Sequence, residues 1–186
     1  ILGLPDNDLY SKLARLGLEV SGDPFWPWHY GQRAYPLSIA AKFRIPLIFY
    51  GERTGVEYGG LKKFWYKPTE DIEDLENLIH SNWQNFDELV KEGIRSGILD
   101  KSNNTGMDQY RHPTPEVVNS VGLKVHWFSY YKKWTPHDNY YYAVQNCGFQ
   151  PNPRRTEGTY SKYASLDDKL DGLHFFMQYI KYGLGR

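Results

Sequence analysis

The chain has 186 residues, 40% of them hydrophobic and 24% charged, which suits one folded domain or a domain with an appendage. Basic and acidic residues balance at 22 each, so no overall field would attract nucleic acid or an anionic membrane. No apolar run reaches the roughly 18 residues of a membrane-spanning helix, and a single cysteine, Cys147, excludes an internal disulfide. The composition predicts a soluble, cytoplasmic protein.

The first sixty residues predict helices around one buried strand. Residues 6–19 place leucines on one face and predict a helix. Residues 21–36 are rich in proline, glycine and aromatic side chains, which predicts a structured loop, and the proline that ends them suits the start of a short helix over 37–43. Ile45–Tyr50 is apolar throughout and predicts a strand of a parallel sheet covered by helices on both faces. The succession of helix, loop, helix and strand favours an α/β fold.

The remainder of the chain is mostly helical in pattern. Residues 121–131 are rich in β-branched and aromatic side chains and predict a strand, whereas 139–145 fits a helix or a strand. Helices are predicted over 71–79 and 86–95, from about Pro115, and over 165–182. The sequence thus predicts a core over 1–60 followed by a mostly helical region over 61–186.

The predicted strand at Ile45–Tyr50 runs into a segment, 51–60, that contains four glycines and two glutamates. In open α/β sheets, ligands bind beyond the carboxyl ends of parallel strands, and glycine lets the backbone approach them closely. Glu52 and Glu57 could bind a metal, accept a hydrogen bond from a ribose or an amine, or act as a base. The alternative is an ordinary solvated turn.

A second candidate is FWPWHYGQR, residues 25–33. Its tryptophans and tyrosine can stack on a sugar or a base, while Gln32 and Arg33 can hydrogen-bond to the polar edge of such a ligand. The alternative is an aromatic loop that closes one edge of the core.

A third candidate lies within residues 154–169. Arg154, Arg155 and Lys162 could contact phosphate, and Asp167 and Asp168, near the start of the last helix, could hold Mg²⁺. The alternative is capping, in which Ser165 with Asp167 and Asp168 favours a helix N-terminus without any metal. No histidine or cysteine spacing suits zinc, and neither a GxxxxGKS/T nor a GxGxxG motif occurs.

Four blocks in a fixed order resemble the N-acetyl sugar amidotransferases: YGQRAYP, IPLIFYGERTGVEYGG, EGTYSKYASLDDKLDGLHFF and IKYGLGR. The family pattern GENGE is replaced here by Gly51-Glu-Arg-Thr-Gly-Val-Glu57, which keeps Glu52 and Glu57. The resemblance covers nearly the whole chain. It implies a PP-loop ATP pyrophosphatase core, related to the adenine-nucleotide α-hydrolase fold, and a place in lipopolysaccharide O-antigen or flagellin nonulosonate biosynthesis.

The resemblance also implies a reaction. ATP would adenylate the oxygen of an acetamido group on the sugar, and ammonia from a separate glutaminase subunit would displace AMP to leave an acetamidino group. ATP and Mg²⁺ would be required, and neither nucleic acid nor membrane insertion is expected.

On this reading, the strand end faces ATP and the activated amide. The candidate catalytic residues are Glu57 and Glu52, and the candidate nucleotide-binding residues are Tyr50, Gly51, Tyr58, Gly59 and Gly60. The candidate substrate-binding residues are Tyr30, Gly31, Gln32 and Lys162, and the candidate metal ligands are Asp167 and Asp168.

The SGGxDS-type phosphate loop that the family carries upstream is not among these 186 residues. We therefore expect the chain to be part of a longer protein and not to turn over by itself. Two other hypotheses remain: a PP-loop enzyme that modifies tRNA, and a non-catalytic module that binds sugar or docks a subunit.

Overall fold

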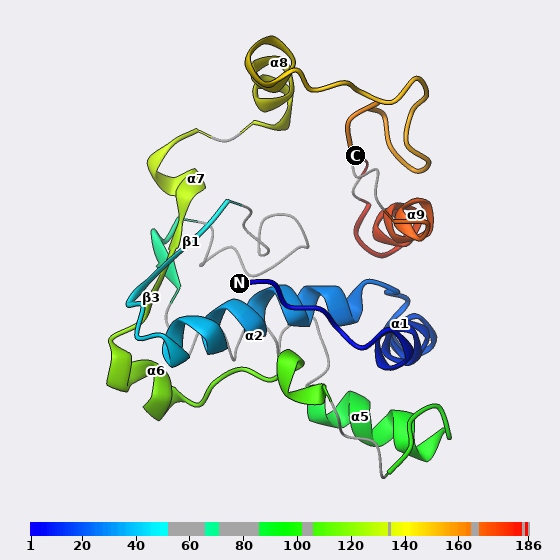
Figure 1. Ribbon diagram of the computed structural model, residues 1–186. Coiled ribbons are helices and arrows are strands. Elements are labelled where there is room, and N and C mark those ends of the chain that lie inside the picture. Colours follow the sequence, from blue (N-terminus) through cyan, green and yellow to red (C-terminus); the bar gives the residue numbers. More distant parts are fainter. Residues whose placement is uncertain are drawn as a thin grey trace. The chain divides into compact units, whose positions relative to one another are not determined.

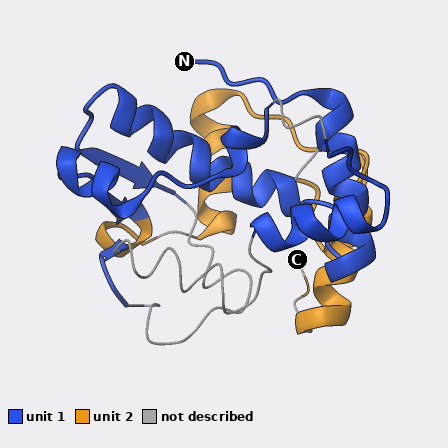
Figure 2. Cartoon of the chain, turned by 90° about the horizontal axis from the view of Figure 1, so that it is seen from below, with its two compact units in different colours: residues 1–128 blue, residues 129–186 orange. Residues whose placement is uncertain are grey.

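The computed structural model describes residues 1–51, 66–70, 86–101, 106–133, 135–164, 168–183 and 185 (Figure 1). The chain forms two compact units, Ile1–Phe128 and Ser129–Arg186 (Figure 2). The boundary predicted at residues 60 and 61 lies outside the described residues.

The described elements form a mixed α/β structure, as predicted. In the first unit they are α1 (Asn7–Ser21), α2 (Trp26–Lys42), β1 (Leu47–Tyr50), β2 (Thr69–Glu70), α5 (Phe86–Arg95), the 3-10 helix η2 (Met107–Tyr110), α6 (Pro115–Val121) and β3 (Lys124–Trp127). The short helix α7 (Phe128–Tyr131) spans the division, and α8 (Pro136–Cys147) and α9 (Asp171–Tyr182) belong to the second unit. None of the helices in the described ranges is long and apolar enough to cross a bilayer.

The first helix begins where the sequence predicts. The carboxylate of Asp6 accepts a hydrogen bond from the backbone N–H of Leu9 at 2.8 Å, which satisfies one of the free donors of the first turn. Leu9, Leu13 and Leu16 are buried along one face of α1. The helix ends at Gly22, whose φ of 65° favours glycine.

The helix α2 corrects the predicted loop over 21–36. It runs without interruption from Trp26 to Lys42 and includes Pro36, so the separate short helix predicted over 37–43 is also wrong. Pro27 occupies the first turn, where no backbone donor is needed. The buried side chains recur at helical spacing, as Trp26, Tyr30, Ala34 and Leu37. Their packing outweighs the proline and aromatic composition on which the loop was predicted.

These aromatic side chains join α2 to α1, α5 and η2 in one core. The ring of Trp26 stacks on Tyr30, with centroids 4.1 Å apart, and on Phe86 at 5.7 Å. The remaining members of this core are Leu9, Leu13, Leu16, Leu89, Val90, Leu99, Met107 and Tyr110. The helix predicted over 86–95 is thereby confirmed as α5.

The described sheet has three strands in the order β1-β3-β2. β1 pairs with β3 in parallel, from Leu47 opposite Lys124 to Tyr50 opposite Trp127, and β2 pairs with β3 in antiparallel. The predicted parallel strand is therefore confirmed over its last four residues.

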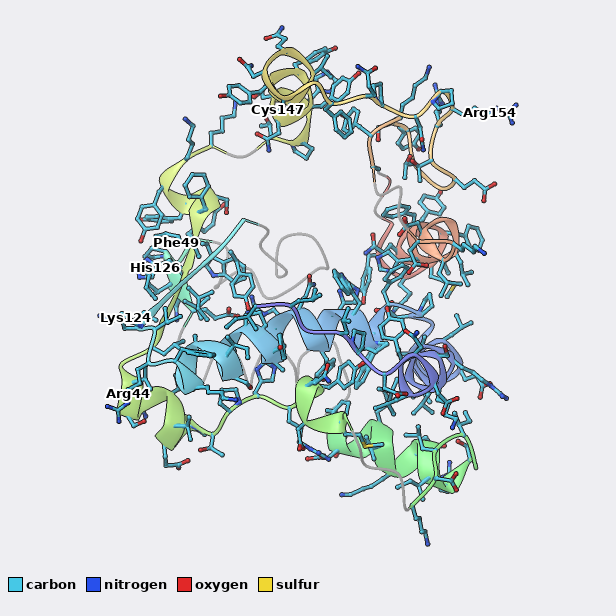
Figure 3. All side chains as sticks on the ribbon, in the orientation of Figure 1. Arg44, Phe49, Lys124, His126, Cys147 and Arg154 are labelled. Atoms are coloured by element: carbon cyan, nitrogen blue, oxygen red, sulfur yellow. The ribbon has the colours of Figure 1, made fainter. Side chains whose placement is uncertain are left out.

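Among the described residues of the first unit, a helical layer packs against one face of this sheet. A second core joins Leu37 and Ala40 of α2 to Val118, Leu123 and Val125, with Ile48 and Tyr50 packed against it. On the opposite face Leu47 is 44% exposed and Phe49 is 54% exposed. Phe49 lies beside His126 there (Figure 3). Cover on the second face of β1 stays a prediction, because residues 52–65 and 71–85 lie outside the described part of the chain.

The other sequence predictions meet mixed outcomes. The strand predicted over 121–131 exists as β3 but ends at Trp127, after which the chain turns into α7. Residues 139–145 are helical, within α8, and the helix predicted from 165 begins at Asp171. The helix predicted over 71–79 lies outside the described residues.

Candidate functional site

The parallel strands β1 and β3 end at Tyr50 and Trp127, which are partners in the sheet register. The two rings lie 5.8 Å apart between centroids. Gly51 follows directly and is half-buried. This is the edge of a parallel pair at which α/β proteins bind ligands.

A buried arginine of α2 reaches this edge. Arg33 is 8% exposed, and its Nη2 donates to Oε2 of Glu70 in β2, which is 7% exposed. The guanidinium carbon lies 4.7 Å from the ring centroid of Tyr50 and 4.9 Å from that of Trp127. We call Arg33, Tyr50, Glu70 and Trp127 the strand-end cluster. Cation–π attraction is strongest in such a desolvated setting.

The hydroxyl of Tyr50 joins two of the predicted binding segments. It donates to the backbone carbonyl of Gln32 at 3.1 Å and lies 3.5 Å from that of Arg33. Burial raises the pKa of Tyr50, with Glu70 adding to this rise and Arg33 opposing it. The hydroxyl therefore keeps its proton and remains a donor. The side chain of Tyr50, predicted to contact nucleotide, thus reaches the backbone of Gln32, predicted to contact substrate.

Two further predicted substrate residues sit deeper in α2. Tyr30 is 2% exposed and belongs to the first core, where burial raises the pKa of its hydroxyl. A Cβ on Gly31 would lie 3.5 Å from the ring of Tyr110, so this turn packs closely on η2. Tyr30 fixes the position of α2 in this structure, and its contact with a sugar stays a prediction.

The remaining predicted residues are divided between the second unit and the chain outside the described ranges. Glu52, Glu57, Tyr58, Gly59, Gly60 and Asp167 lie outside the described residues. Lys162 is exposed in the second unit, where its carbonyl accepts from the N–H of Asn152 at 2.9 Å. Asp168 Oδ1 accepts from the N–H of Leu170 at 2.8 Å, immediately before α9. The N-cap of α9 is Leu170 and carries no side-chain capping hydrogen bond, so Asp168 stabilises the turn before the helix and does not cap it.

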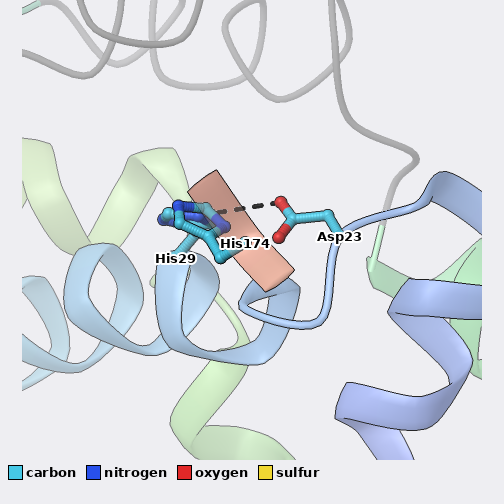
Figure 4. A group of neighbouring side chains, drawn as sticks. All are labelled: Asp23, His29 and His174. Carbon is cyan, nitrogen blue, oxygen red and sulfur yellow. Dashed lines mark ion pairs between the residues drawn. The ribbon is translucent and has the colours of Figure 1, made fainter. Parts of the chain in front are cut away.

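The carboxylate of Asp23 stabilises the start of α2. Asp23 Oδ1 accepts from the N–H of Phe25 at 3.0 Å, and Asp23 Oδ2 lies 3.6 Å from His29 Nε2 (Figure 4). These contacts span the first turn of α2. They stabilise the N-terminal end of α2, the helix to which Gln32 and Arg33 belong.

Two residues of the site were missed at the sequence level. Glu70 belongs to a strand of two residues and His112 to a connecting segment, so neither lies in a periodic pattern. Both ring nitrogens of His112 are buried without a hydrogen-bond partner among the described residues. Burial and then the charge of Arg33 lower the pKa of His112 to about 4. A neutral histidine therefore lies near the strand-end cluster at neutral pH.

This depressed pKa predicts a loss of stability in acid. In the unfolded chain His112 binds a proton once the pH falls below the ordinary histidine pKa of 6.5. In the folded chain it binds that proton only when the pH falls to about 4. Between about pH 7 and about pH 4.5 the free energy of unfolding should therefore fall by roughly 2 kcal/mol on account of this group. Denaturant titrations of His112→Gln should show that much less acid sensitivity than the wild type. The exposed His137→Gln is the control, and equal acid sensitivity in all three proteins would contradict the assignment.

No protein-family model matches the sequence, and neither does any curated protein.

Proposed function

We propose that this chain is part of an ATP-dependent amidotransferase that converts an acetamido group on a bacterial surface-polysaccharide or nonulosonate sugar into an acetamidino group. The observation that carries the proposal is the hydrogen bond from Tyr50 to the carbonyl of Gln32. It joins the blocks YGQRAYP and IPLIFYGE, which are separate in the sequence, at the carboxyl end of a parallel strand pair. Both blocks carry the resemblance, and this edge is where open α/β sheets bind their ligands.

The proposed reaction requires the amide oxygen to be activated before ammonia can replace it. The amide oxygen is a poor leaving group, so it first attacks the α-phosphorus of ATP and releases pyrophosphate. Ammonia then adds to the amide carbon, the carbon–oxygen bond breaks, and AMP leaves with the former amide oxygen. The ammonia nitrogen loses its surplus protons to a base and remains in the acetamidino group. Glu57 is the proposed base that orients ammonia.

The other roles follow from the position of each residue. Gly51 follows the end of a parallel strand, and its lack of a side chain would let a phosphate or ribose approach the backbone. Mg²⁺ would neutralise phosphate charge, and carboxylates are ligands that it prefers, which suits Glu52. Asp168 uses one carboxylate oxygen on the N–H of Leu170, so it fits a metal less well. Ammonia would come from a glutaminase subunit, in the cytoplasm.

The decisive experiment follows oxygen and nitrogen in the intact enzyme. An acetamido sugar nucleotide that carries heavy oxygen in its amide is incubated with ATP, Mg²⁺ and isotopically labelled ammonia. We expect heavy oxygen in AMP, labelled nitrogen in the sugar product, and pyrophosphate exchange that depends on the sugar.

Other outcomes would point elsewhere. Exchange that requires tRNA in place of the sugar would favour the tRNA-modifying hypothesis. Sugar binding that neither needs nor consumes ATP would favour the binding module. Heavy oxygen found in phosphate rather than in AMP would overturn adenylation as the activating step.

A further inference from the structure

We infer that the side of the sheet turned away from α2 is a docking surface for an acidic, amphipathic helix of a partner protein. On this side lie Leu47 and Phe49 of β1 and Lys124 and His126 of β3, with Arg44 shortly before β1 (Figure 3). We call these five residues the basic-apolar face. The proposed reaction assigns no role to any of them, so this surface goes beyond the proposed function.

The sheet register places apolar and basic side chains next to each other on this face. Leu47 is the partner of Lys124, and Phe49 is the partner of His126, with ring centroids 5.5 Å apart. Strand side chains alternate, so Ile48 points to the other face, where it packs against the second core. Leu47 and Phe49 remain 44% and 54% exposed. Apolar side chains that are exposed together beside polar ones are typical of an interaction site.

The exposed charge on this face is positive. Lys124 and Arg44 are both exposed. No acidic side chain shares the face in the three described strands, because Thr69 is the partner of His126 and Glu70 points to the other side. Apolar side chains bordered by cations are complementary to an apolar stripe bordered by carboxylates. Nucleic acid fits less well, because its affinity comes mainly from the neutralisation of many phosphates and this face offers few cations.

Arg44 gives an independent indication of an anionic partner. Its φ is 55°, a left-handed conformation that favours glycine, and no other non-glycine residue in the described ranges has a positive φ. Arg44 lies in the turn that ends α2, where its N–H donates to the carbonyl of Ala41 at 3.2 Å and that of Ile45 donates to Ala40 at 2.8 Å. The described part of the chain gives Arg44 no ion-pair partner. An unpaired arginine at a strained position is typical of a binding surface.

The test measures the Kd of a labelled helical peptide for the full-length protein by fluorescence anisotropy, since a helix is the usual layer on a sheet face in α/β proteins. The peptide carries leucines at helical spacing, with glutamates and alanines at the other positions. The control peptide has lysines in place of the glutamates. We expect the glutamate peptide to bind at least about tenfold more tightly, with an affinity that falls as salt is added. Equal binding of the two peptides would overturn the inference.

Two substitutions at Arg44 separate binding from stability. Arg44→Gly removes both the charge and the strain, so it should weaken binding of the glutamate peptide at least about fivefold while raising the denaturant midpoint. Arg44→Gln removes the charge alone and should weaken binding equally without raising the midpoint. Arg95→Gln, on α5, is the control and should bind as the wild type does. Wild-type binding by both Arg44 variants would contradict the assignment.

The apolar part of the face is tested with single cysteines in a Cys147→Ser background. Phe49→Cys should react with a maleimide about as fast as Val117→Cys, which replaces a 43% exposed side chain of α6. At saturation, the glutamate peptide should slow the reaction at position 49 and leave that at position 117 unchanged. Slow reaction at position 49 without peptide would show that the chain covers this face itself and would overturn the docking surface. Displacement of the peptide by single-stranded DNA would assign the face to nucleic acid instead.

Discussion

In the proposed amidotransferase, replacing the proposed base Glu57 with glutamine should lower the rate of amidation at least about 10²-fold, because a general base usually contributes that much or more. Glutamine keeps the size of the side chain and removes its ability to accept a proton. The change should be measured as labelled nitrogen incorporated into the sugar per unit time. Glu88→Gln, on the exposed face of α5, is the matched control and should retain the wild-type rate.

Measuring adenylation and amidation separately distinguishes the proposed role of Glu57 from a general loss of the active site. If Glu57 acts on ammonia, sugar-dependent pyrophosphate exchange should persist in Glu57→Gln while amidation is lost. Loss of both activities with normal ATP binding would assign Glu57 to adenylation instead. An amidation rate within about threefold of the wild type would remove Glu57 from the chemistry.

The largest effect on stability is expected at the buried ion pair of the strand-end cluster. Glu70→Gln leaves the guanidinium of Arg33 buried without its carboxylate, and breaking such a pair costs about 3–5 kcal/mol. Denaturant unfolding, monitored by a probe in the first unit, would measure this loss. Asp87→Asn is the control, because Asp87 faces Arg111 in an exposed pair for which the expected change is below about 1 kcal/mol.

The double variant Arg33→Met, Glu70→Leu completes this experiment. Without Arg33 and Glu70, no buried charge of this pair is left without its partner. The double variant should therefore regain most of the stability that Glu70→Gln loses. A Glu70→Gln protein within about 1 kcal/mol of the wild type would contradict a buried, mutually dependent pair.

The elements that the sequence predicts best are those set by local signals. Helix α1 follows from its leucine spacing and from Asp6, and α6 from Pro115 in its first turn. Helix α2 was missed because its prolines and aromatics are local signals for a loop, whereas contacts with α1 and α5 decide its structure. In the same way, the sequence reveals that β1 is apolar but not that Leu47 and Phe49 stay on an open face.

The candidate site, too, can be predicted from local sequence signals only in part. The end of the Ile45–Tyr50 strand is predictable from its position before a glycine-rich segment. Glu70 is not, because it is brought to Arg33 by antiparallel pairing of a strand of two residues. The lowered pKa of His112 is equally invisible, since it arises from burial and from a charge far away in the sequence. Long-range pairing leaves no periodic mark on the chain.

The open face of β1 has a practical consequence for work with the protein in vitro. Among the described strands β1 lies at an edge of the sheet, and such a strand with exposed Leu47 and Phe49 can take up a further strand from a neighbouring chain, which is how sheet proteins aggregate at high concentration. Because strand side chains alternate, a lysine at position 47 would change the solvent-facing side and leave Ile48 and Tyr50 in place. This position is therefore the first choice for improving yield before ligands are tested.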